Sequence, residues 1–279
     1  MTAPVPLPKP TPSVTPMFVQ EQDFAARQYK GRRENQEDYY AFADAAELGE
    51  EPLSKILLVV GDGLGAHAGG SVASYLAVNA FVRAFHEQPG DASWRLRTAL
   101  DTANDTLGFI TERMPAVAPP MGTTMLSVLI SQKEVQWISV GDSPLFLYRK
   151  GNLTRLNADH SLAPLLEERV KAGQMTAEEA ANHPGRHTLQ SALMGMPLTL
   201  VDFAADPIKL LPDDIIIAAS DGLFTLTHKA LQELLHFGQN TTADKITDAI
   251  LFAIRRINFD RQDNATIGVV KIPGGTTDS

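Results

Sequence analysis

Two stretches of the sequence end an apolar run with the same three residues, Asp-Gly-Leu. ILLVVGDGL places Asp62 after the first run, and IIIAASDGL places Asp221 after the second. A third apolar run, VQWISV, is followed by Asp142, and Asp263 precedes a fourth. Turn chemistry would explain one such ending, because Asp and Gly are favoured where a chain reverses. It would scatter Asn, Ser and Gly among the others, whereas this chain repeats aspartate.

An acidic pair, Glu37-Asp38, lies in the segment GRRENQED before another expected strand. Carboxylates gathered at one point repel one another, and they stay ionised together only when a cation neutralises them. The chain has no cysteine, so thiolate sites are excluded, and oxygen ligands favour magnesium, manganese or calcium. Gly63 permits a close backbone approach beside Asp62, so its carbonyl oxygen is a further candidate ligand. The pattern therefore predicts a divalent-metal site.

Beside a metal site, an arginine of the pair Arg32-Arg33 is suited to bind a substrate oxyanion such as phosphate through two hydrogen bonds. Taken alone, an arginine pair is more often surface charge. Metal ligands, an anion clamp and the lack of a candidate nucleophile among the motifs together indicate metal-assisted hydrolysis of a phosphate ester.

Other motifs compete with this interpretation. Residues 61–66, GDGLGA, fit the loose dinucleotide fingerprint G-x-G-x-x-A after a strand and before a helix. Asp62 would stand where a pyrophosphate must lie, and no acidic residue follows at the required interval on a second strand, so we reject this reading. Among the histidines, His160 is expected to be a hydrogen-bonded structural residue. His67 is a minor candidate for contact with the site.

The elements that must position these residues alternate between Val- and Ile-rich runs and helical patterns. Strands are expected at residues 124–130, 135–140, 145–148, 153–156, 199–203, 215–219 and 265–271. Helices are expected near residues 162–173, 177–182, 228–237 and 242–257. Two earlier helices should present one face each, the first with Val72, Tyr75, Leu76, Val82 and Phe85, the second with Leu96, Leu100, Ala103, Leu107 and Ile110. Hairpin-like strands between pairs of consecutive helices favour an α+β layered fold over strict βαβ winding.

Composition narrows the class of protein further. The chain has 279 residues, 44% of them hydrophobic, and a net charge of −9, which argues against nucleic acid or an anionic membrane surface as the main partner. No apolar stretch approaches the length of a membrane span, and the N-terminus does not read as a secretory signal, so we expect a cytoplasmic protein.

The first sixteen residues, MTAPVPLPKPTPSVTP, carry six prolines and should be extended and polyproline-like. We favour a disordered leader over the alternative, a ligand for an aromatic groove. The expected organisation is a disordered tail over residues 1–17, one folded domain over residues 18–273, and a second disordered tail over residues 274–279.

Taken together, the motifs resemble the metal-dependent Ser/Thr protein phosphatases of type 2C, in their bacterial form. The resemblance covers nearly the whole chain, from about Ala26 to Ile272, and its pieces occur in order: GRRENQED, VVGDGLGAHAGG, MGTTM, SVGDSPLFLYRKGNLTRLNADHS, HPGRHTLQSALMG, AASDGLF and DNATIGVV. It implies an α+β fold with a central β-sandwich of two antiparallel sheets, flanked by helices on both outer faces. It also implies hydrolysis of phosphoserine or phosphothreonine in proteins by a water that bridges two Mn²⁺ or Mg²⁺ ions.

The resemblance assigns metal ligands residue by residue. In this family two metals share a bridging aspartate, which Asp62 matches, and the carbonyl of Gly63 is a further ligand. Asp221 and Asp263 match the remaining direct ligands of one metal. Glu37 matches a ligand or water-bridged contact of the other.

It also assigns residues around the two metals. Asp38 matches a supporting residue close to Glu37, and Arg33 matches the phosphate-holding arginine. Asp142 matches a ligand of a weaker third metal. The segment from Asp159 to Gly195 matches the flap beside the site, which is thought to influence substrate access.

Two departures bear on the mechanism. Many members have an acidic third-metal ligand where this chain has Thr225, so occupancy of a third site is open. Animal members have a histidine proposed as general acid where this chain has Leu64. The expected partners are phosphorylated proteins, opposite a Ser/Thr kinase, with no nucleic acid or membrane and with a monomeric chain. The alternative is a phosphatase-like binding module that recognises a phosphoprotein with little or no turnover.

Overall fold

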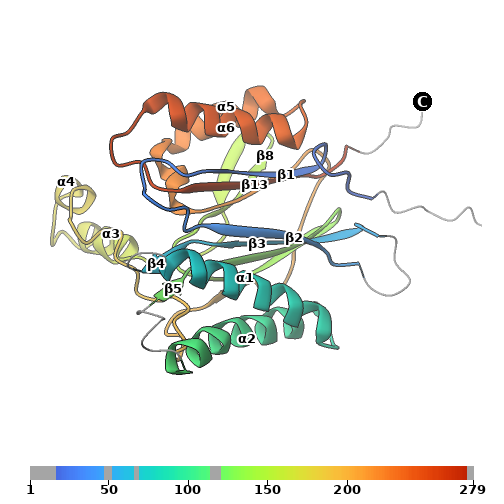
Figure 1. Cartoon of the computed structure of the whole chain (residues 1–279). Coiled ribbons are helices and arrows are strands. Elements are labelled where there is room, and N and C mark those ends of the chain that lie inside the picture. Colours follow the sequence, from blue (N-terminus) through green and yellow to red (C-terminus); the bar gives the residue numbers. More distant parts are fainter. Residues whose placement is uncertain (1–16, 47–51, 66–68, 114–120, 275–279) are drawn as a thin grey trace, which may run out of the picture.

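The computed structural model describes residues 17–46, 52–65, 69–113 and 121–274. In this part of the chain, two β-sheets lie face to face, and a pair of helices covers the outer face of each (Figure 1). The antiparallel sandwich with helices on both outer faces confirms the expected α+β fold.

Antiparallel pairing joins all the neighbouring strands of both sheets. The first sheet has the order β1 (Phe24–Tyr29), β13 (Ala265–Lys271), β12 (Ile215–Ala219), β8 (Leu145–Arg149) and β9 (Asn152–Arg155). The second has the order β10 (Asp202–Phe203), β7 (Glu134–Val140), β6 (Met125–Ser131), β3 (Lys55–Gly61) and β2 (Tyr39–Asp44), with β11 (Ile208–Lys209) also on β7. A small separate ribbon pairs β4 (Gly63–Gly65) with β5 (Met121–Thr123).

The helices form the two outer layers. α1 (Gly69–Glu87) and α2 (Ala92–Arg113) lie on the second sheet, whereas α5 (His228–Gly238) and α6 (Ala243–Ile257) lie on the first (Figure 1). Two short helices, α3 (Ala163–Lys171) and α4 (Ala177–Ala181), project from one end of the sandwich. No helix among the described residues is long and apolar enough to cross a lipid bilayer.

Three apolar layers explain why the central strands are continuous hydrophobic runs rather than alternating ones. On β3, Leu57 and Val59 face α1 and α2, whereas Leu58 and Val60 face the other sheet. Every one of these side chains is fully buried. Both faces of the sheet are therefore covered, as the sequence of the apolar runs suggested.

The prediction for the packed face of α1 was wrong for Val72 and Tyr75, whereas Phe85 is buried and Leu76 and Val82 pack against the core. Val72 and Tyr75 are 44% and 52% exposed, and the buried face is formed mainly by alanines together with Val78, Phe81 and Phe85. Small side chains allow α1 to lie close to its neighbours, so alanine marks the core here. The stripe expected on α2 is confirmed from Leu96 to Leu107. The strand expected at residues 199–203 is limited to β10.

Candidate active site

The aspartates that follow the central strands gather at one end of the sandwich. Asp62 follows β3 and Asp142 follows β7, both in the second sheet. In the first sheet, Asp221 begins the short 3₁₀ helix η1 (Asp221–Thr225) after β12, and Asp263 lies just before β13. Because each sheet is antiparallel, the end of one strand lies beside the start of the next, and this connectivity brings the four residues together.

The register places the acidic pair at the same end. Tyr39, the first residue of β2, is opposite Gly61, the last residue of β3. Asp38 precedes β2 and Asp62 follows β3, so the two residues lie at the same end of this strand pair. Glu37 is fixed by its backbone, since its N–H donates to Asn264 Oδ1 at 2.7 Å and its carbonyl accepts from Ser74 Oγ at 2.6 Å.

The electrostatics of Asp62 show how closely the carboxylates converge. The pKa of Asp62 is raised well above its usual range, first by burial and then by the charges of Asp38, Asp221, Asp142 and Asp263. A side-chain hydrogen bond with Asp62 lowers the pKa of Asp221, which places the two carboxyls side by side. The structure thus brings these aspartates together, and their assignment as metal ligands stays a prediction.

The neighbouring aspartates are similarly perturbed. Burial raises the pKa of Asp38 to about 7, although its Oδ2 accepts hydrogen bonds from Ser220 Oγ and Thr266 Oγ1, both at 2.7 Å. Burial and the charge of Asp221 raise the pKa of Asp142 to about 7. The pKa of Asp221 itself is raised to about 6, by burial and by Asp263. Such displaced carboxyl pKa values are typical of functional sites.

Gly63 lies where no side chain could be accommodated. A Cβ atom at this position would come 2.2 Å from the carbonyl oxygen of Gly70 and 2.5 Å from that of Glu37. The Gly63 N–H donates to the same Glu37 carbonyl at 3.2 Å. The start of α1 is therefore pressed against the loop that carries Asp62, and a larger residue at position 63 would separate them.

Arg33 reaches the rim of this acidic centre. Its Nη2 is 2.5 Å from Oδ2 of Asp263, and its side chain is 56% exposed. This ion pair raises the pKa of Arg33 and holds the guanidinium beside the aspartates. An exposed guanidinium at the edge of a buried anionic cluster has free N–H groups for an incoming oxyanion.

The residues fit a hard divalent cation. All candidate donors are oxygen atoms, and two of them, Asp38 Oδ1 and Asp221 Oδ1, are buried with no hydrogen-bond partner among the described residues. Such an orphaned carboxylate oxygen is costly unless a proton or a cation satisfies it. Among the described residues, no three acidic or histidine side chains are arranged to hold one ion by themselves. Carboxylate and carbonyl oxygens are the donors that Mg²⁺ and Mn²⁺ prefer.

Several positioning residues were missed by the sequence analysis. Asn264 is buried, and its Nδ2 donates to the carbonyl oxygens of Lys30 at 2.7 Å and Asn35 at 3.0 Å while its Oδ1 holds Glu37. It thereby fixes the loop that carries Arg33. The only sequence signal was its place directly after Asp263. Ser220 and Thr266, which hold Asp38, gave no comparable signal.

Histidines contribute in different ways. His160 is buried, its Nδ1 accepts from the backbone N–H of Gly141 at 3.1 Å, and burial lowers its pKa, so it is structural as expected. His187, to which no role was assigned, lies close enough to lower the pKa of Asp221. The segment between α4 and β10 therefore approaches the acidic centre. His67 lies outside the described residues.

The raised carboxyl pKa values predict an unusual pH dependence of stability in the metal-free chain. A carboxyl whose pKa is higher in the folded chain than in the unfolded one binds more protons when folded. The stabilisation is complete below the unfolded value of about 4 and is lost as the pH rises through the folded value. That folded value is about 7 for Asp38 and Asp142 and about 6 for Asp221. We expect the thermal midpoint in chelator, followed by circular dichroism, to fall between about pH 5 and pH 7.5.

Asp142→Asn provides the control for this prediction. It removes one titrating group and keeps its shape, so the slope of the free energy of unfolding should decrease by up to about 1.4 kcal/mol per pH unit. A metal-free midpoint that rises across the interval would contradict the assigned pKa values.

An antiparallel sandwich with a cluster of carboxylates and an arginine at one mouth defines a metal-dependent hydrolase of phosphate esters. A family model described as protein phosphatase 2C matches residues 34–248. The chain belongs to the protein phosphatase 2C family, and the resemblance inferred from the motifs is confirmed.

Individual relatives agree with this assignment. The chain is 27% identical over 221 residues to the serine/threonine phosphatase stp of Listeria innocua, with 77% of this chain and 84% of that protein covered. The crystal structure of the serine/threonine phosphatase PstP/Ppp of Mycobacterium tuberculosis matches with a TM-score of 0.73 and 26% identity, covering 90% of this chain and 98% of that one. The catalytic domain of PstP in complex with two manganese ions matches with a TM-score of 0.69 and 25% identity, covering 89% and 97%.

Proposed function

We propose that this chain uses Mn²⁺ or Mg²⁺ to remove phosphate from phosphoserine and phosphothreonine in proteins. The observation that carries the proposal is the convergence of Asp62 with four further aspartates, whose charges all raise its pKa. Family membership supports it, as does the manganese found in the related PstP domain. We assign the activity to a domain over residues 18–273.

The proposed metal ligands are the residues at the strand ends. Two core ions would be held by Asp62, the Gly63 carbonyl, Asp221, Asp263 and Glu37, and a weak third ion by Asp142. When bound, these cations would supply Lewis acidity to the phosphate oxygens and lower the pKa of an attacking water toward neutrality.

The side chains around the ligands have separate tasks. Arg33 would release Asp263 and bind the phosphate of the substrate. It would then stabilise part of the negative charge on the phosphate as the ester bond breaks. Asp38 would stay fixed by Ser220 and Thr266 and orient the water shell of the site. Asn264 would keep the Arg33 loop in register. No side chain among these is placed as a nucleophile, so the proposed reaction is a direct attack of water on phosphorus.

Phosphate release measures this function directly. The full chain should liberate phosphate from phosphothreonine and phosphoserine peptides in Mn²⁺, and a chelator should abolish the reaction reversibly. Phosphopeptide binding with negligible turnover in saturating Mn²⁺ would instead identify the alternative, a phosphatase-like binding module. An unphosphorylated peptide of the same sequence serves as the binding control.

We infer a cytoplasmic monomer that opposes a Ser/Thr kinase and does not act on nucleic acid or at a membrane. The net charge of −9 supports the last two points, because it disfavours polyanions and anionic lipid surfaces.

Thr225, the neutral residue in the position of an expected third-metal ligand, has a structural contact. Its Oγ1 donates to Gln262 Oε1 at 2.6 Å, and Gln262 Nε2 donates to the backbone carbonyl of Asp263 at 3.1 Å. Thr225 thus braces the loop that carries Asp263 and adds no charge near Asp142. A third ion would consequently bind weakly, and activity should continue to rise at metal concentrations above those that saturate the core.

Adding charge at this position should strengthen the third site. We expect Thr225→Asp to lower the Mn²⁺ concentration for half-maximal activity by roughly tenfold, about 1.4 kcal/mol of binding. Thr225→Asn has a similar shape without charge and should follow the wild type. The wild type and the two variants are compared by measuring hydrolysis of a phosphothreonine peptide while Mn²⁺ is titrated. Superimposable curves for the Asp and Asn variants would show that a third ion is irrelevant or held elsewhere.

A further inference from the structure

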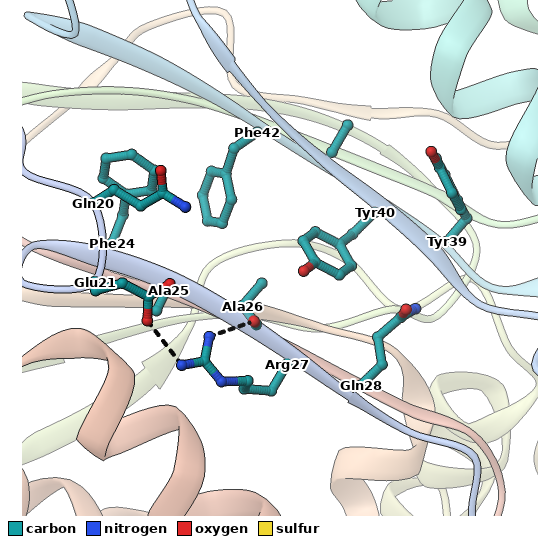
Figure 2. A pocket seen from close by; sticks show the side chains of 11 residues that line it. Gln20, Glu21, Phe24, Ala25, Ala26, Arg27, Gln28, Tyr39, Tyr40 and Phe42 are labelled. Atoms are coloured by element: carbon teal, nitrogen blue, oxygen red, sulfur yellow. Dashed lines mark hydrogen bonds and ion pairs between the residues drawn. The ribbon is translucent and has the colours of Figure 1, made fainter.

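The open side of the sandwich carries a groove that the phosphatase reaction does not use. β1 and β2 are the outer strands of their sheets, and neither has a strand partner on its free edge within the described part of the chain. Between them lies a groove of about 520 Å³, lined by side chains from both strands and by Gln20 and Glu21 (Figure 2).

Aromatic rings form part of the wall of this groove, beside polar and alanine side chains. Phe24 of β1 and Phe42 of β2 meet across it with ring centroids 4.9 Å apart, and Tyr40 lies 6.3 Å from Phe42, edge to face. Ala26 lies beside these rings, and its small side chain leaves space that a larger side chain would fill (Figure 2). At one end Gln28 closes the groove by donating to the carbonyl of Asp38 at 3.1 Å. The groove is therefore preformed.

The polar groups of the groove suit a ligand that offers acceptors. Within the described residues the hydroxyl of Tyr40 makes no hydrogen bond, and it is free to donate to a backbone carbonyl. Arg27 lies at the rim, but its guanidinium already donates to Glu21, Asp248 and the Ala26 carbonyl, so the Tyr40 hydroxyl is the donor that a ligand would meet. Aromatic grooves with such a donor bind proline-rich segments, since a polyproline helix is already extended and has few N–H groups to satisfy.

The chain itself contains a segment of this chemistry next to the groove. Residues 1–16 lie outside the described residues and read MTAPVPLPKPTPSVTP, with six prolines, no acidic residue, and the apolar stretch VPLP at residues 5–8. They join the folded part at Met17, three residues before Gln20 at the end of the groove. Sixteen residues in a polyproline helix extend roughly 50 Å. The six-residue edge strands span roughly 20 Å, so the segment is long enough to turn back and lie along them.

We propose that the groove between β1 and β2 binds the proline-rich segment 1–16 of the same chain, with VPLP packed on Phe42 and Tyr40. The segment then covers apolar rings and an open sheet edge, which otherwise invite association with other chains. The proposal takes up the alternative that the sequence left open, a ligand for an aromatic groove, in place of a disordered leader. The contact is independent of the phosphatase reaction.

The absence of cysteine from the sequence makes a direct test possible. Thr2→Cys in the full chain gives a single attachment point for a nitroxide, whose proximity broadens nearby amide resonances. We expect the backbone amides of residues 25–28 and 39–42 to lose at least about three times more intensity than those of α2. Dilution should leave the effect unchanged. Equal broadening of both regions, or none, would overturn the proposal.

Matched variants separate the groove from a general effect of the label. Phe42→Ala should reduce the selective broadening to the level of α2, whereas Phe237→Ala, which removes an 82% exposed ring on α5, should leave it intact. Replacing Pro4, Pro6, Pro8 and Pro10 by serine tests the same contact without altering the folded part and should also abolish it. Persistence in the serine variant would overturn the proline-based contact. Broadening in a mixture of labelled chains with isotope-enriched unlabelled chains would assign the groove to a second copy and overturn the intrachain arrangement.

Discussion

Asp62→Asn should reduce hydrolysis of a phosphothreonine peptide by roughly a thousandfold or more while the fold is retained. The reason is the central place of this carboxylate. Its pKa responds to four other aspartates, and its side chain is hydrogen bonded to Asp221. Asparagine keeps the shape but lacks the charge and one of the two anionic oxygens, so two ions that share this carboxylate would lose their common ligand.

The stability of the same variant gives a second, independent readout. Removing one of several repelling carboxylates should leave the metal-free chain as stable as the wild type or more stable. The stabilisation by added Mn²⁺, measured as the shift of the thermal midpoint, should decrease strongly. Asp105→Asn, a change of an exposed aspartate on α2, serves as the matched control and should alter neither quantity. If Asp62→Asn kept a tenth of wild-type turnover, the assignment of Asp62 as a shared ligand would be wrong.

The sequence predicted those features whose pattern lies within one short stretch of residues. Asp62 and Asp221 were identifiable because each ends an apolar run that is long enough to be a buried strand. The antiparallel connections then bring such ends together, whatever the details of packing. The fold class followed from the same runs and from the pairing of helices along the chain.

The supporting contacts were not predictable in this way. Thr266 and Asp38 are 228 positions apart, and Asn264 holds Glu37 across 227 positions. Thr266 and Asn264 are residue types that also occur in ordinary loops, so their types gave no signal. Val72 and Tyr75 were wrongly placed on the packed face of α1 for a related reason: periodicity favours large apolar residues, whereas close helix packing buries alanine.

The ion pair of Arg33 with Asp263 is another long-range contact that could not be predicted from the sequence. It also changes the expected effect of replacing Arg33. The sequence analysis treated the arginine as an anion clamp and the aspartate as a metal ligand. In the metal-free chain they form an ion pair of 2.5 Å between residues 230 positions apart. Arg33 therefore neutralises a proposed ligand when no cation is present, and it must leave that ligand when substrate and metal bind.

We therefore expect Arg33→Ala to lower kcat/KM for a phosphothreonine peptide by roughly a hundredfold, about 2.7 kcal/mol, with much of the loss in KM. The affinity for Mn²⁺ should be unchanged or slightly higher, because a competing positive charge has been removed from Asp263. Arg33→Lys keeps the charge but loses the planar fork, and it should recover only part of the loss. Arg32→Ala is the matched control: its Nη2 donates to Asn258 Oδ1 at 2.5 Å, away from the aspartates, so the variant should retain most activity. Isothermal titration with Mn²⁺ and steady-state kinetics on the same preparations separate the two effects. An equal loss of metal affinity and of kcat/KM in Arg33→Ala would show that Arg33 holds the site together rather than binding phosphate.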